Sequence, residues 1–166
     1  MGRFGEDKVF LPLKSDFNQS ECKWITVGIG GDDQVEKLFK LKYPSCKIFG
    51  IEASRDQYAN FSSYGTVIPY GVGVKSGSFN LTIRKNTSYK HEKVKVLALS
   101  DLLDKFVKTR FIQYMTIDIE GFEFGILEEL LTGKELHKQG IVFCQIDAEL
   151  HSDKTKIREI MHKYDS

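Results

Sequence analysis

Hydrophobic and polar positions follow two alternating patterns along the chain. Short runs rich in β-branched and aromatic residues predict strands at residues 24–29, 47–52, 66–74, 111–119 and 141–148. Apolar residues at helical spacing, together with capping side chains, predict helices at residues 35–42, 54–61, 99–107, 122–131 and 154–164. Two further runs, 79–84 and 93–97, predict a small hairpin. Strands that alternate with helices are typical of a parallel sheet covered by helices, so the pattern predicts an α/β fold.

Length and charge narrow the class of protein further. A chain of 166 residues fits one domain, since a domain usually has roughly 100–200 residues. Lysine and arginine number 24 against 23 acidic residues, for a formal net charge of +1. Nucleic-acid binders normally carry a basic patch, so this balance argues against a nucleic-acid partner. The sequence contains neither an apolar run long enough for a bilayer nor a secretory signal, so we expect a soluble domain with no membrane segment.

A glycine-rich turn follows the first predicted strand. Gly28, Ile29 and Gly30 stand where that strand leads into the first helix, and glycine there lets a nucleotide-like ligand approach the backbone. A structural turn without a ligand explains these glycines equally well. The second strand ends in Glu52, 24 positions after Gly28, where a carboxylate can accept both ribose hydroxyls. Together, the turn and the acidic strand end favour an adenosyl ligand.

The residues after the turn help to distinguish between adenosyl ligands. The dinucleotide fingerprint G-x-G-x-x-G would require glycine at position 33, but Asp33 stands there with Asp32 beside it. Two carboxylates at a helix N-terminus repel a pyrophosphate and tolerate a positively charged sulfonium. The turn therefore favours S-adenosylmethionine, and an NAD-dependent oxidoreductase is the less favoured interpretation.

The run from Tyr114 to Glu123, Tyr-Met-Thr-Ile-Asp-Ile-Glu-Gly-Phe-Glu, resembles the hallmark motif of the FkbM family of class I methyltransferases. Residues 27–31, 51–53 and 145–151 also fall where that family places its first, second and fifth strands. The resemblance implies a Rossmann-like, doubly wound, mostly parallel sheet with strand order 3-2-1-4-5. It also implies S-adenosylmethionine as cofactor and O-methylation of a hydroxyl on a small molecule or glycan.

The sequence departs from the family pattern in two places. Thr26 and Gly30 stand where the family's first turn usually has an acidic residue and an asparagine. The C-terminal antiparallel strand pair of class I methyltransferases is not found after the fifth strand. We therefore expect an extension at 1–21 and an FkbM-like methyltransferase domain at 22–166 that is truncated at its C-terminus. A non-catalytic interaction module that keeps the fold is the alternative.

The resemblance implies a role for individual residues. The expected cofactor-binding positions are Gly28, Ile29, Gly30, Glu52, Ala53, Ser54, Val72 and Asp118. Asp118 ends the fourth strand, where methyl transfer occurs in this fold, and is the first candidate for proton acceptor or substrate positioner. Glu120 and His151 are the other catalytic candidates.

Simpler roles for these residues stay open. Glu120 could cap the following helix, and His151 could be an exposed loop histidine. A divalent metal held by Asp118, Glu149 and His151 is a further alternative, but their spacing carries no metal signature, so the sequence predicts no metal site.

Three cysteines bear on the compartment. Cys22 and Cys46 each lie two residues before a predicted strand, and neighbouring strands are close enough for a disulfide, although the cysteines alone favour two free thiols. Cys144 lies in the fifth strand and is expected to be a small core residue.

Four asparagines, Asn18, Asn60, Asn80 and Asn86, all open an N-x-S/T sequon. Asn60 falls in a predicted helix and is expected to be poorly accessible, whereas Asn80 and Asn86 fall in the exposed hairpin. Sequons and a cysteine pair suggest a glycoprotein matured in the secretory-pathway lumen, provided that the parent protein carries a signal or anchor that this chain lacks.

Overall fold

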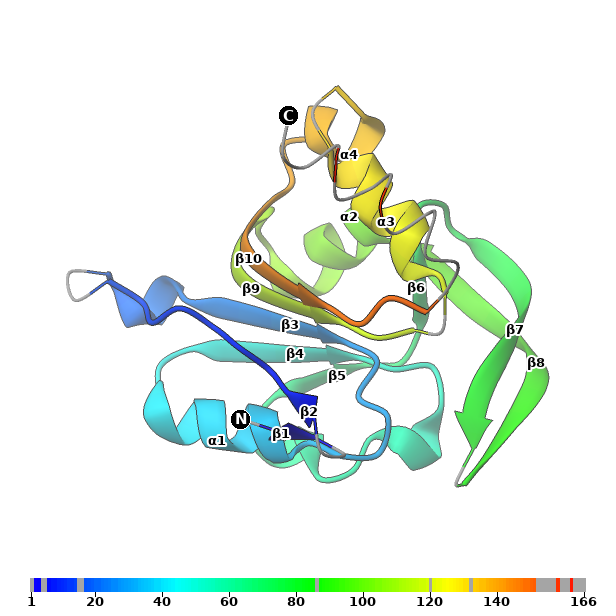
Figure 1. The fold of residues 1–166 in the computed structure, drawn as a ribbon, viewed down its shortest axis with the longest axis horizontal. Helices are drawn as coiled ribbons and strands as arrows, with labels where there is room; N and C mark the ends of the chain where they lie inside the picture. The colour runs from blue at the N-terminus through cyan, green and yellow to red at the C-terminus, as the bar shows by residue number, and fades with distance from the viewer. Residues whose placement is uncertain are drawn as a thin grey trace.

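A five-stranded parallel sheet forms the centre of the computed structural model, which describes residues 2–3, 6–14, 17–85, 87–119, 121–131 and 133–151, with Arg158 and His162 (Figure 1). Its strands are β3 (Lys23–Val27), β4 (Lys47–Ile51), β5 (Thr66–Ile68), β9 (Phe111–Ile117) and β10 (Val142–Ala148). They lie side by side in the order β5-β4-β3-β9-β10, and every neighbouring pair is parallel. Numbered along the chain, this order is 3-2-1-4-5, which confirms the predicted fold class.

Helices cover both faces of the sheet, and each face carries its own apolar core. Trp24 and Tyr114 pack on one face beneath α1 (Gln34–Lys42). Ile25 and Met115, the next residues along the same strands, pack on the other face. That second face is covered by α2 (Leu99–Leu102), the π-helical turn η4 (Leu103–Val107), α3 (Glu123–Leu130) and α4 (Glu135–Lys138). Alternating side chains therefore bury β3 and β9 on both sides, as parallel strands require.

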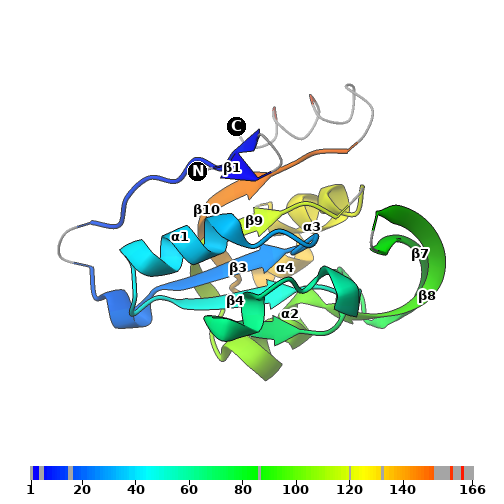
Figure 2. The same cartoon turned by 90° about the horizontal axis from the view of Figure 1, so that it is seen from below.

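A second sheet rises from the carboxyl-terminal side of the first. It contains β6 (Gly71–Gly73), β7 (Gly77–Lys85) and β8 (Ser88–Ala98) in the order β6-β8-β7. β7 and β8 pair in antiparallel register from Gly77 opposite Val96 to Lys85 opposite Ser88, which confirms the predicted hairpin and lengthens it. Figure 2 shows this hairpin curling past the carboxyl ends of the parallel strands.

Two predictions for the region from the end of β4 to β6 are wrong. The helix expected at 54–61 is instead two 3₁₀ turns, η2 (Arg55–Gln57) and η3 (Phe61–Ser63), separated by Ala59 with a positive φ of 48°. A positive φ interrupts a right-handed helix. The single strand expected at 66–74 divides into β5 and β6, which belong to different sheets. Pro69 lies between them and has no N–H to donate to a ladder.

Several short elements were not predicted: the strands β1 (Gly2–Arg3) and β2 (Glu6–Asp7), the 3₁₀ turn η1 (Gln19–Glu21), and α4. Elements of two to four residues carry too little periodicity to register in a hydrophobic pattern. The helix expected at 99–107 is an α-helical turn followed by the π-helical turn η4. The helix expected at 154–164 lies outside the described residues, apart from Arg158 and His162.

A disulfide joins Cys22 and Cys46, which confirms that pairing. Both side chains are fully buried beside the amino ends of β3 and β4. The bond closes a loop with a sequence separation of 24, and cross-linking a loop of that size stabilises a fold by about 3 kcal/mol. The prediction for Cys144 is wrong, because this cysteine is exposed. It lies on β10, the outermost strand of the parallel sheet, with exposed Val142 and Ile146 two positions to either side.

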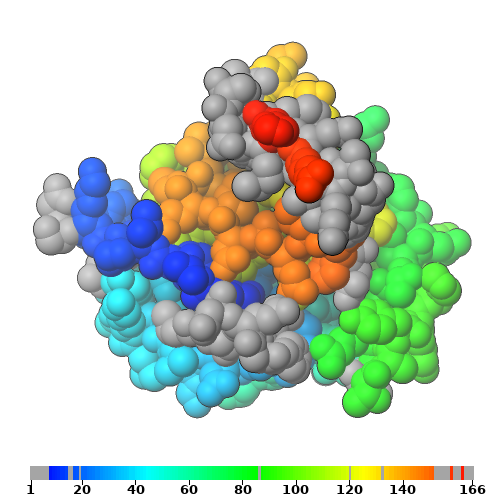
Figure 3. Space-filling model, in the orientation of Figure 1, coloured from blue at the N-terminus to red at the C-terminus, as the bar shows by residue number. Residues whose placement is uncertain are grey.

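Residues 8–14 lie across β10 and β9 (Figure 3). The Phe10 ring lies 5.2 Å from that of Trp24 and 5.1 Å from that of Tyr114, edge to face. The backbone N–H of Leu11 donates to Gln145 Oε1 at 2.8 Å, and its carbonyl accepts a hydrogen bond from the Tyr114 hydroxyl at 3.0 Å. This segment therefore completes the core on the α1 face. The domain boundary at residue 22 stays a prediction.

Candidate functional site

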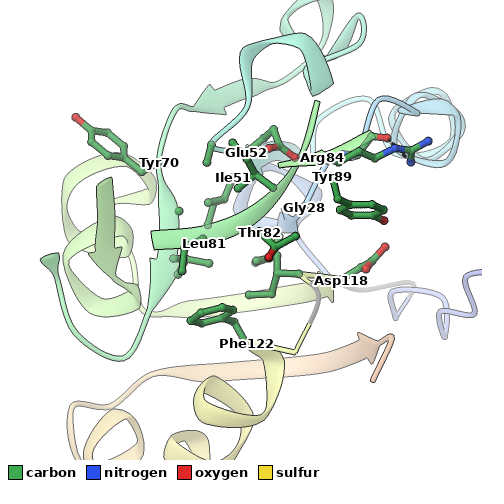
Figure 4. A pocket seen from close by; sticks show the side chains of 17 residues that line it. Gly28, Ile51, Glu52, Tyr70, Leu81, Thr82, Arg84, Tyr89, Asp118 and Phe122 are labelled. Carbon is green, nitrogen blue, oxygen red and sulfur yellow. Dashed lines mark hydrogen bonds between the residues drawn. The ribbon is translucent and has the colours of Figure 1, made fainter. Parts of the chain in front are cut away.

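A cavity of about 130 Å³ opens at the carboxyl ends of β3, β4 and β9. Parallel α/β sheets bind ligands at this edge, where the strand order reverses. The hairpin covers the cavity with Leu81, Thr82 and Arg84 from β7 and Tyr89 from β8. Figure 4 shows Glu52 at one end of the cavity and Phe122 at the other, with Thr82 between them.

Backbone hydrogen bonds at and beside Gly28 join the ends of β3, β4 and β9 at the floor of the cavity. Its N–H donates to the carbonyl of Ile51 at 2.9 Å, and the N–H of Asp118 donates to the carbonyl of Val27 at 3.0 Å. Gly28 has a φ of +87°, and a Cβ there would overlap the carbonyl oxygen of Asp118. Both the left-handed backbone and the close approach require glycine at this position.

Glu52 holds the glycine turn against the end of β4. Its carboxylate accepts hydrogen bonds from the N–H of Gly30 at 3.3 Å and from the N–H of Ser54 at 2.8 Å. Gly30 has a φ of +65°, in the left-handed region that favours glycine. Burial and the nearby Glu52 charge raise the pKa of Tyr58, so this phenol stays protonated.

The expected cofactor-binding residues separate into two groups. Those that line the cavity are Gly28, Gly30, Glu52, Ala53, Val72 and Asp118. Ile29 and Ser54 do not line it: Ile29 is fully buried in the core of the α1 face, and the Ser54 hydroxyl donates to Asp56 at 2.6 Å. The cofactor-binding role of the whole set stays a prediction.

A second group of side chains meets beside the cavity, after β9 and β10. His151 Nδ1 lies 2.7 Å from Glu123 Oε1, and its Nε2 lies 3.1 Å from Glu149 Oε1 and 3.7 Å from Asp118 Oδ1. Two of the three catalytic candidates, Asp118 and His151, thus lie together. Glu120, the third, lies outside the described residues. Glu123 begins α3 and is fully buried, and the sequence analysis did not single it out.

Residues of the hairpin were also missed as candidates. The guanidinium of Arg84 donates to the carbonyl of Gly30 at 3.4 Å, across a sequence separation of 54. The sequence predicts the hairpin itself, but only the fold shows that it turns back over the glycine turn. The alternating hydrophobic and polar residues of the hairpin do not indicate the direction in which it turns.

A buried hydrogen-bond chain explains the departure at Thr26. The Thr26 hydroxyl donates to Glu36 Oε1 at 2.9 Å and accepts from the Thr116 hydroxyl at 3.2 Å. Thr26 and Glu36 are both fully buried. The family usually has an acidic residue on the strand at the position of Thr26. In this chain Glu36 of α1 supplies a carboxylate behind the glycine turn instead. A buried carboxylate needs hydrogen-bond donors, and Thr26 supplies one.

The N-terminus of α1 already holds a carboxylate. Asp32 Oδ1 accepts a hydrogen bond from the N–H of Gln34 at 3.0 Å, whereas the Asp33 side chain makes no capping hydrogen bond. The first turn of a helix otherwise attracts phosphate through these N–H groups. The arrangement is therefore unfavourable for a pyrophosphate at this turn, as the sequence predicts.

A parallel sheet in this order, with a glycine turn and an acidic strand end around one cavity, defines a Rossmann-like α/β protein. The sequence profile of the methyltransferase FkbM domain matches residues 2–166, and the chain belongs to this family of methyltransferases. Comparison with curated proteins and with solved structures found no match.

Proposed function

We propose that the chain is an S-adenosylmethionine-dependent methyltransferase that methylates a hydroxyl of a small molecule or glycan. The observation that carries this proposal is that Gly28, Glu52 and Asp118 line one cavity. The family supports methyl transfer, and the cavity supports an adenosyl cofactor. The near-neutral net charge of +1 favours a small hydroxylated acceptor over nucleic acid.

Each residue of the cavity has a role in this proposal. Gly28 and Gly30 admit the cofactor to the backbone, and Glu52 accepts the ribose hydroxyls. Ala53 and Val72 pack against the adenosine. Asp118 would hold the acceptor hydroxyl beside the methyl group that S-adenosylmethionine would supply. The hydroxyl proton moves to Asp118, so that catalysis combines positioning with the removal of one proton.

Replacing Asp118 with asparagine tests this role. We expect Asp118→Asn to lower turnover by about 10²–10⁴-fold, the usual contribution of a general base. Its affinity for S-adenosylmethionine should stay unchanged, because the ribose contacts are made elsewhere. The assay measures S-adenosylhomocysteine formed with a panel of sugars, glycans and hydroxylated polyketides.

Asp101→Asn is the matched control, because Asp101 is exposed on α2, away from the cavity. Equal turnover in Asp118→Asn and the wild type would show that Asp118 has no catalytic role. If the wild type binds the cofactor but forms no product with any acceptor, the interaction module becomes the better explanation. Gly30 in place of the family's usual asparagine is the feature that favours that alternative.

We further propose that the chain matures in the secretory pathway. A buried disulfide is typical of oxidising compartments. The sequon asparagines Asn18, Asn60 and Asn80 are exposed, which corrects the expectation for Asn60, and Asn86 lies outside the described residues. Among the described residues, the helices lack the length and apolar character needed to cross a membrane.

Secretion from a eukaryotic cell line tests the compartment. With an added signal sequence, we expect the secreted chain to lose mass on treatment with an N-glycosidase. Thiol labelling in denaturant should modify one cysteine before reduction and three after it, because only Cys144 is free. Unmodified asparagines together with three reactive thiols would contradict this proposal.

A further inference from the structure

The group formed by Asp118, Glu123, Glu149 and His151 has an arrangement that methyl transfer alone does not explain. Asp118 follows β9, Glu149 and His151 follow β10, and Glu123 begins α3. Neighbouring parallel strands bring their carboxyl ends to one edge, so residues more than 30 positions apart meet here. Three carboxylates lie within 4 Å of the two ring nitrogens of one histidine.

Glu123 sets the orientation of this histidine. Its carboxylate is fully buried, and Oε1 lies 2.7 Å from Nδ1 of His151. A carboxylate accepts hydrogen bonds, so Nδ1 carries a proton and the lone pair of a neutral ring lies on Nε2. Nε2 in turn faces Glu149 Oε1 at 3.1 Å and Asp118 Oδ1 at 3.7 Å. Two carboxylate oxygens and Nε2, which offers a lone pair when the ring is neutral, therefore lie within 4.8 Å of one another.

We propose that Asp118, Glu149 and His151 bind a divalent metal ion. One ligand atom from each lies within 4.8 Å of the other two. Adjacent ligands of an octahedral ion, each about 2.1 Å from the metal, are about 3 Å apart. The separations of 3.1 Å and 3.7 Å are close to this value, so small side-chain rotations complete the site.

The buried Glu123 carboxylate is a separate observation that supports a cation here. A metal-binding histidine usually donates its other ring N–H to a carboxylate, which fixes the ring and strengthens the ligand. Glu123 has this relation to His151, with 0% of its side chain exposed. Its Oε2 is buried and has no hydrogen-bond partner within the described part of the chain. A buried carboxylate is costly without compensation, and a cation at Nε2 of the ring provides it.

The ligand atoms indicate which ions fit. Two carboxylate oxygens and one imidazole nitrogen suit a first-row ion such as Mn²⁺, which accepts both kinds of ligand. Ca²⁺ prefers six to eight oxygen ligands, so an imidazole at one position disfavours it.

The position of the site suggests what the ion does. Asp118 lines the cavity, whereas Glu149 and His151 do not. An ion at this point borders the place assigned to the acceptor, where it would bind the acceptor hydroxyl and favour loss of its proton. This role, unlike the metal site itself, rests on the proposed function.

Manganese binding by the full chain tests the site. Mn²⁺ in solution gives a strong electron paramagnetic resonance signal that falls on binding, and no cofactor or acceptor is added. We expect Glu149→Gln and His151→Ala to weaken Mn²⁺ affinity at least tenfold. Glu123→Gln, behind the histidine, should weaken it by about 10–100-fold. Glu149 is exposed, so its variant should fold and keep the test informative.

Matched controls lie on α4. Glu135→Gln and His137→Ala remove the same chemical groups from exposed positions on that helix, and we expect both to bind Mn²⁺ like the wild type. An undiminished Mn²⁺ signal at millimolar protein, or equal loss of affinity in the control and site variants, would overturn the metal site. Either result leaves the proposed methyl transfer standing. A chain that binds Mn²⁺ but not S-adenosylmethionine would instead keep the metal site and remove the proposed function.

Discussion

Replacing Gly28 with alanine is expected to destabilise the folded chain by about 2 kcal/mol or more and to abolish binding of S-adenosylmethionine. The left-handed backbone at φ +87° accounts for part of this effect. The larger part comes from the new Cβ, which would overlap the carbonyl oxygen of Asp118. That carbonyl belongs to the end of β9 and moves only if β3 and β9 separate, which would distort the floor of the cavity.

Gly140→Ala separates the two contributions. Gly140 also has a positive φ, +71°, but a Cβ there meets nothing within 4 Å. This control should therefore lose only the cost of the left-handed conformation, about 1 kcal/mol, and bind the cofactor normally. Urea unfolding measures the stability of both variants, and calorimetric titration measures cofactor affinity. Equal loss of stability in the two variants would show that the approach to Asp118 is unimportant.

The parts of the fold that the sequence predicts correctly are those with a strong local signal. Six consecutive residues of β9, from Ile112 to Ile117, are buried, as a strand covered on both faces requires, and all but Gln113 and Thr116 are apolar. The helix predicted at 54–61 does not form. Ser54 resembles a helix N-cap, and the spacing of the polar residues after it resembles that of a helix. Ala59, however, adopts a positive φ, which the sequence does not indicate. The prediction for Cys144 failed because the fifth strand was expected to be buried, although the predicted order 3-2-1-4-5 already places this strand at the sheet edge.

The candidate site shows the same difference between local and distant information. Gly28 and Glu52 follow directly after strands, so the parallel sheet alone brings them to one edge. The pairing of His151 with Glu123 spans 28 positions and depends on how α3 packs against β10. The bond from Arg84 to Gly30 spans 54 positions and depends on the curl of the hairpin. Contacts of this kind follow from tertiary packing, which a single sequence does not reveal.

Replacing Glu52 with glutamine is expected to weaken S-adenosylmethionine binding by about 10- to 100-fold. Two ribose hydroxyls that donate to a charged carboxylate lose part of their stabilisation when the acceptor becomes neutral, and a hydrogen bond to a charged group contributes about 1.5–3 kcal/mol. In the wild type, the Glu52 carboxylate accepts hydrogen bonds from the backbone N–H groups of Gly30 and Ser54. The side-chain amide of glutamine would instead place an N–H donor toward these groups or toward a ribose hydroxyl.

Glutamine is preferable to alanine at this position because it keeps the volume and one acceptor oxygen. Alanine would leave the N–H groups of Gly30 and Ser54 without their acceptor and loosen the turn, so that lost binding would report on folding as well as on the ribose. Glu135→Gln removes an equal charge from the exposed face of α4 and should bind as the wild type does. Calorimetric titration distinguishes the outcomes. Unchanged affinity in Glu52→Gln would remove the ribose assignment alone, whereas a folded wild type that binds no S-adenosylmethionine would remove the adenosyl site as a whole.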